Sequence, residues 1–143
     1  MRGEPTLPAI PAEVAAAFDA FSEPARLRLL DVRRLIFETA KRTAGVRPLT
    51  EALRWGEPAY LTEATGSGST IRLGLSKQSA VQCAILFNCR TTLIVSFRAH
   101  FPDAFAYQGN RAILLGSCGP LPEAPLTMCL AMALTYHRRR QSI

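Results

Sequence analysis

The chain of 143 residues has the size of a single domain and is long enough to bury a hydrophobic core. Hydrophobic residues make up 48% of it and charged residues 20%, a globular composition that excludes an intrinsically disordered chain. The longest apolar runs, Ala84 to Phe87 and Met128 to Leu134, are far too short for a membrane span, so we expect no membrane association.

The N-terminal third follows a helical pattern. Residues 1–11 contain several prolines and are expected to form a loose lead-in. Apolar residues at helical spacing then predict a short amphipathic helix over residues 12–21 and a longer helix over residues 24–43. Thr50 is placed to cap one brief helical turn that ends at Trp55.

The middle of the chain changes to the two-residue period of strands. Its pattern predicts strands over residues 59–63 and 69–75, joined by the glycine-rich residues 64–68, and a central strand over residues 80–87. The glycine-rich segment lacks the lysine and the following helix of a phosphate-binding loop, so we expect a flexible hairpin connection. Residues 91–101 fit the spacing of a strand and also that of a helix.

The C-terminal third predicts one more hairpin and a last helix. Short strands over residues 105–107 and 111–115 flank a turn, and Pro125 opens the helix. Helices followed by an antiparallel meander and another helix make an α+β protein, whose apolar faces are best buried between two layers. We therefore expect a two-layer sandwich, with an antiparallel sheet of about five strands and the N- and C-terminal helices on one of its faces.

The only tryptophan lies in the segment Arg54-Trp55-Gly56-Glu57-Pro58-Ala59-Tyr60, where a glycine widens and a proline restricts the backbone freedom. This segment resembles the signature of the YdhG-like family, whose function is unknown. The resemblance covers roughly residues 12–140 as one domain and continues through residues 69–74, 89–93, 97–98, 101–103 and 109–113. It implies a compact α/β domain with a frataxin-like outline, a helix over residues 91–101 and no established enzymatic activity.

Cysteines and histidines give little sign of a metal or redox centre. The four cysteines form no CxxC pair and lie in apolar or mixed segments, which is typical of reduced thiols in a cytoplasmic protein. His100 and His137 lie on separate predicted elements without carboxylates around them, so the sequence predicts neither a metal site nor a catalytic triad. We expect no cofactor, and no secretion signal, because residues 1–11 lack an apolar core.

The charge of the chain is clearly basic. The net charge of +6 comes from 17 basic and 11 acidic residues, and 15 of the basic residues are arginines. Clustered positive charge attracts phosphates and carboxylates. A solvated basic surface is the simpler explanation, and we favour it over a nucleic-acid footprint.

The strongest candidate site combines aromatic rings with arginines. Small-molecule pockets commonly have aromatic walls and a few fixed polar groups, and arginine adds planar donors suited to carboxylate or phosphate. We predict a ligand-binding pocket lined by Trp55, Tyr60, Arg72, Phe97, Arg98, Tyr107 and Arg111. The alternative is that the aromatic residues are core packing and that the arginines are surface or structural pairs.

Three functions compete. We favour a small binding module for an anionic or aromatic small ligand, without catalysis, acting as a monomer or a homodimer. Iron handling is an alternative that the frataxin-like outline suggests, but iron prefers clustered oxygen ligands and the helix over residues 24–43 carries only Asp31 and Glu38. The other alternative is an interaction domain that docks a protein partner or a nucleic acid through its basic surface.

Overall fold

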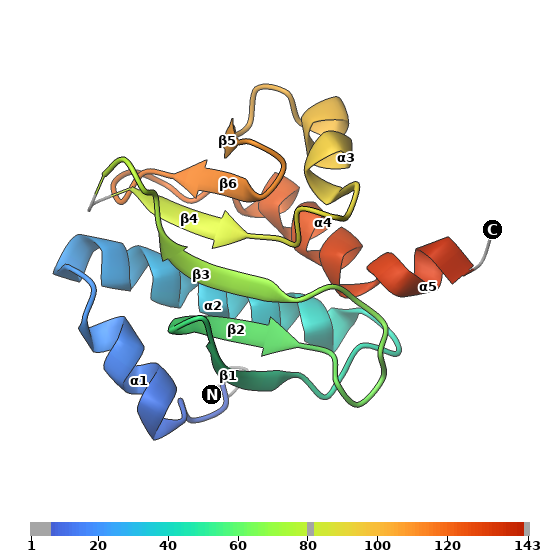
Figure 1. Ribbon diagram of the computed structural model, residues 1–143, viewed down its shortest axis with the longest axis horizontal. Helices are drawn as coiled ribbons and strands as arrows, with labels where there is room; N and C mark the ends of the chain where they lie inside the picture. Colours follow the sequence, from blue (N-terminus) through green and yellow to red (C-terminus); the bar gives the residue numbers. More distant parts are fainter. Residues whose placement is uncertain (1–6, 80–81, 142–143) are drawn as a thin grey trace, which may run out of the picture.

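An antiparallel sheet of six strands forms one layer of the computed structural model, which describes residues 7–79 and 82–141 (Figure 1). The strands are β1 (Thr50–Arg54), β2 (Glu57–Leu61), β3 (Ile71–Leu75), β4 (Cys83–Leu86), β5 (Ala106–Gln108) and β6 (Ala112–Leu115). Their order across the sheet is β1-β2-β3-β4-β6-β5. The first four strands therefore form a meander, and β6 returns beside β4 so that β5 becomes an outer strand.

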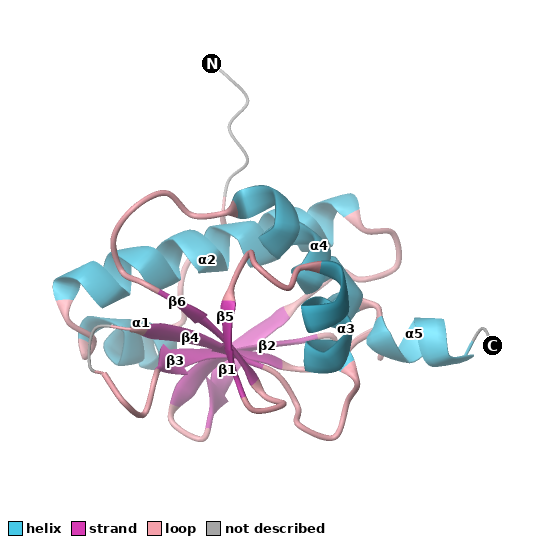
Figure 2. Ribbon diagram, turned by 90° about the horizontal axis from the view of Figure 1, so that it is seen from above, coloured by secondary structure: helices cyan, strands magenta, loops and turns pink. Residues whose placement is uncertain are grey.

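Helices form the second layer. They are α1 (Ala12–Asp19), α2 (Glu23–Arg42), α3 (Leu93–His100), α4 (Glu123–Leu134) and α5 (Tyr136–Gln141). Figure 2 shows α2 and α4 side by side over one face of the sheet, while α1 packs on α2, β1 and β2. The buried apolar residues of α1 to α4 all join one hydrophobic core with the inward residues of the strands. We call the opposite face of the sheet the open face.

The long helix α2 explains why the core lies where it does. Leu29, Val32, Ile36 and Ala40 recur at intervals of three and four residues, and each is at most 1% exposed. This spacing places them on one stripe of the helix, facing the sheet. Each fully buried leucine, valine or isoleucine side chain contributes roughly 1.5–3 kcal/mol to stability, so this stripe holds the two layers together.

Most of the expected architecture is present. The α+β class, the antiparallel sheet and the helical layer on one face are confirmed, with six strands in place of about five. The helical alternative for residues 91–101 is correct, because α3 occupies Leu93–His100. Residues 1–6 of the predicted lead-in and residues 80–81 of the predicted central strand lie outside the described residues.

The additional strand is the segment that was expected to form a brief helical turn. Thr50–Arg54 is β1, and Arg54 pairs with Glu57 of β2, which leaves Trp55 and Gly56 as a two-residue loop. Both loop residues have positive φ, 57° and 77°, as a type I′ hairpin turn requires. The helical-turn prediction is therefore wrong.

The glycine-rich connection between β2 and β3 is held in place, contrary to the expected flexible loop. The Ser69 amide donates to the carbonyl of Ala133 at 2.9 Å, and the Ser67 hydroxyl donates to the carbonyl of Leu134 at 2.8 Å. Gly68 lies so close to the end of α4 that a side chain there would collide with backbone atoms. The loop thus binds carbonyls at the end of α4 that have no partner within the helix.

Candidate functional site

The β1–β2 hairpin carries Trp55 into solvent. Trp55 is 88% exposed, although tryptophan is among the side chains that gain most from burial. Its positive φ costs a residue other than glycine about 1–3 kcal/mol. Neither the core nor the turn is therefore stabilised by tryptophan at this position.

Small side chains make the open face shallow next to this loop. The strand register places Ala59, Arg72, Leu86 and Ala112 opposite one another in succession across four strands. Gly74 lies two residues after Arg72 and so points to the same face. Because Ala59 and Gly74 beside Arg72 are small, the long side chain of Arg72 rises above a shallow surface on which a flat ligand has room.

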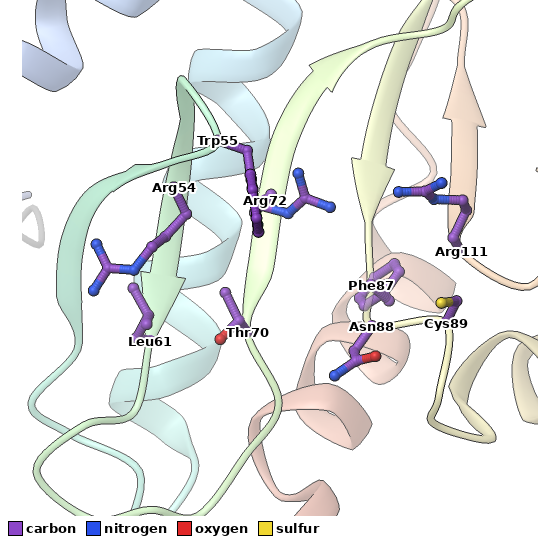
Figure 3. A pocket seen from close by; sticks show the side chains of 9 residues that line it. All are labelled: Arg54, Trp55, Leu61, Thr70, Arg72, Phe87, Asn88, Cys89 and Arg111. Atoms are coloured by element: carbon purple, nitrogen blue, oxygen red, sulfur yellow. The ribbon is translucent and has the colours of Figure 1, made fainter.

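A first cavity of about 320 Å³ lies on the open face (Figure 3). Arg54, Arg72 and Arg111 are among its nine lining residues, and none of the nine is acidic. Arg54 pairs at 3.3 Å with Glu63, which does not line the cavity. Within the described part of the chain, no hydrogen bond or ion pair engages the side chain of Arg111. The cavity therefore carries an excess of positive charge and attracts anions.

A second cavity of about 470 Å³ adjoins the first. The two share Trp55, Arg72 and Arg111 as lining residues. The second cavity is also lined by Glu57, Leu75, Lys77, Leu86, Gln108 and Gly109. It therefore contains a carboxylate and an amide, both of which accept hydrogen bonds.

An ion pair lies where the two cavities meet. Arg72 Nη1 donates to Glu57 Oε1 at 2.5 Å, and both side chains are partly shielded, at 19% and 28% exposure. Gly74 makes this possible, because a side chain at that position would collide with Glu57 Oε2. Burial raises the pKa of Glu57, although the positive charges of Arg72 and Arg111 act to lower it. The Arg72 guanidinium keeps further N–H donors beyond the one that binds Glu57.

Three of the seven predicted site residues come together. Trp55, Arg72 and Arg111 line both cavities, from the hairpin loop, β3 and the turn before β6. Tyr60 and Phe97 do not join them, because both are fully buried on the helical side of the sheet. For these two aromatic residues, core packing is the correct reading.

The last two predicted residues form a separate pair. The Arg98 guanidinium lies over the Tyr107 ring, 5.3 Å from its centroid. The Tyr107 hydroxyl donates to the backbone carbonyls of Phe97 at 3.1 Å and Phe101 at 2.7 Å. This arrangement fixes the end of α3 against β5, and neither residue lines the two cavities.

The prediction missed three charged residues of the site: Arg54, Glu57 and Lys77. Arg54 and Glu57 flank the two-residue loop and are paired across the hairpin. Once Trp55-Gly56 is recognised as a hairpin turn, strand alternation places both on the open face with Arg72. The signal in the sequence is Gly56, two residues after the end of β1 at Arg54.

Neither a metal centre nor a known relative identifies the site. Across residues 7–79 and 82–141, no three histidine, cysteine, aspartate or glutamate side chains are grouped so that they could hold a metal ion, and no helix could cross a membrane. No family model, no curated protein and no solved structure matches this chain.

Proposed function

We propose that this protein is a small binding module that holds an anionic ligand with a flat aromatic part on its open face, without catalysing a reaction. The observation that carries the proposal is that Arg72 and Arg111 point toward each other over a cavity that no acidic residue lines (Figure 3). Arginine presents planar, permanently charged donors that match a carboxylate or a phosphate. The YdhG-like assignment remains a proposal as well, and the α+β class supports it.

Trp55 supports the aromatic half of the proposal. Asparagine or aspartate before the glycine would suit the turn better, since these residues tolerate positive φ. An exposed indole beside arginine side chains instead offers a flat surface on which a ring can stack. The ring and the charges border the same space, so one ligand can contact both.

The first test uses the fluorescence of the only tryptophan. Titration with inorganic phosphate and with benzoate should shift or quench the Trp55 emission. Arg111→Ala should raise the Kd at least about tenfold, because one charge-assisted hydrogen bond is lost. The matched control is Arg42→Ala, which removes the same charge from an exposed position in the last turn of α2. Equal weakening by both variants would mean that only the net charge matters, and the site would be rejected.

A second variant separates the ring from the charges. Trp55→Asn should leave the stability of the fold unchanged or slightly higher, because asparagine suits positive φ. Calorimetry should then show weaker binding of benzoate and unchanged binding of phosphate. If both ligands bind the variant as they bind the parent protein, Trp55 is not part of the site.

The two alternatives predict different behaviour of the same sample. Iron handling requires stoichiometric binding of ferrous iron in an anaerobic titration. An interaction domain for nucleic acid requires binding whose affinity falls steeply with salt, because counterions are released from the polymer. A small-anion site predicts neither result.

A further inference from the structure

The two cavities together make an elongated trough. Thr70 lines the first cavity, Leu75 and Lys77 line the second, and Arg72 borders both, so the trough follows β3. Extended strand rises about 3.3 Å per residue, so β3 alone, from Ile71 to Leu75, spans roughly 13 Å. Trp55 borders both cavities and therefore lies near the middle of this trough.

The two cavities differ in one group, a carboxylate. The first cavity is lined by Arg54, Arg72 and Arg111 and by no acidic residue. The second shares Arg72 and Arg111 with it, and adds Lys77 together with the carboxylate of Glu57. Both cavities therefore attract an anion, and the second also offers a charged hydrogen-bond acceptor.

Glu57 has accepting capacity left. Its Oε1 accepts from Arg72, whereas no hydrogen bond reaches Oε2 from the described residues. An ionised carboxylate can accept several hydrogen bonds. An N–H donor beside Glu57 would therefore be stabilised.

On the basis of the proposed function, we infer that the ligand is an aromatic anion that also carries an amino group on its ring system. The anion binds Arg72 and Arg111 in the first cavity, the ring lies beside Trp55, and the amino group donates to Glu57 in the second cavity. Two kinds of compound have this chemistry: nucleoside monophosphates with an amino-substituted base, and aminobenzoates. In 4-aminobenzoate the flat ring separates the two groups, and in a nucleotide the base and the ribose separate them.

The test compares ligands that differ only in the amino group. Calorimetry measures adenosine 5′-monophosphate against purine riboside 5′-monophosphate, and 4-aminobenzoate against benzoate. The amino compound of at least one pair should bind about tenfold more tightly, as expected for one hydrogen bond to a charged acceptor. The pair that shows the preference identifies the source of the ligand.

Two variants assign the preference to Glu57. Glu57→Gln removes the charge with little change in shape and should reduce the preference to about twofold or less, while the anion still binds. Glu63 pairs with Arg54 but borders neither cavity. Glu63→Gln therefore removes a charge outside the site and should keep the preference for the amino compound. Circular dichroism checks that both variants are folded.

The outcomes separate this inference from the proposed function. If none of the four ligands and no inorganic phosphate binds, the binding module itself is rejected. If the anions bind but both pairs show equal affinities, the amino group is irrelevant and only the inference is overturned. If the amino compound still binds more tightly to the Glu57→Gln variant, the inference is also overturned.

Discussion

Replacing Glu51 with glutamine should destabilise the fold strongly, because its carboxylate neutralises an arginine in the core. Arg33 of α2 donates to Glu51 from Nε at 2.6 Å and from Nη2 at 2.9 Å. The Tyr60 hydroxyl donates to the same carboxylate at 2.8 Å, and burial, together with the charge of Glu51, raises the Tyr60 pKa, so the phenol stays a donor. The two charged side chains are only 4% and 5% exposed.

The size of the effect follows from this burial. An exposed ion pair contributes about 0–1 kcal/mol, but removal of one partner from a buried pair costs about 3–5 kcal/mol, because an unneutralised charge remains. In Glu51→Gln the guanidinium of Arg33 keeps the Pro8 carbonyl at 2.7 Å and one amide oxygen as acceptors. We therefore expect a loss of about 3 kcal/mol in the free energy of unfolding.

Urea unfolding followed by far-ultraviolet circular dichroism measures this loss. Trp55 fluorescence is unsuitable as the probe, because the ring is already exposed in the folded protein. The matched control is Glu63→Gln, which breaks the exposed pair with Arg54 and should cost less than about 0.5 kcal/mol. A loss below about 1 kcal/mol for Glu51→Gln would refute the claim that this ion pair is buried and neutralises Arg33.

Three further predictions concern other parts of the fold. Gly68→Ala should lower the unfolding free energy by about 1–3 kcal/mol, because the new methyl group meets rigid backbone of α4, whereas Gly116→Ala, with open space around it, should change it little. Burial raises the pKa of the Cys83 thiol to about 11 and that of Cys129 to about 12, so just above pH 9 only the unfolded chain loses these protons. The unfolding free energy should therefore fall as the pH rises, by up to about 1.4 kcal/mol per pH unit for each thiol. Urea unfolding midpoints at pH 7 and pH 10 measure this fall. Arg138→Ala should lower the melting temperature by only a few degrees, because this exposed side chain loses one hydrogen bond, to the carbonyl of residue 44.

The residue pattern left α3 open between helix and strand, whereas α1 and α2 were predictable because apolar residues recur along them at helical spacing, and α2 was placed to within one residue at each end. β1 was not, and the reason is physical. Glu51 occupies an inward position of β1, so the expected alternation of apolar and polar residues is absent. Only the arginine from a distant helix makes a carboxylate acceptable there, and a local pattern cannot show that contact.

The candidate site was predictable only in part. Arg72 alternates with the inward residues Ile71 and Leu73, so the strand pattern alone places it on the open face. Tyr60 and Phe97 could not be assigned in this way, since a large aromatic side chain fits a core and a pocket equally well. Their assignment requires knowing which face of the sheet the helices cover, and the sequence pattern does not give this.

The arginines of the open face also explain why this face can remain without a helical cover. Ala59, Ala84 and Ala112 are at most 1% exposed, although all three lie on the open face of the sheet. Long arginine side chains can lay their apolar stems over such small residues while the guanidinium groups stay in water. Arg72 stands between Ala59 and Leu86 in the register and suits this role, so replacing it removes packing together with charge. Arg111 lies in the turn before β6, outside that row, and its replacement therefore isolates the electrostatic contribution to binding.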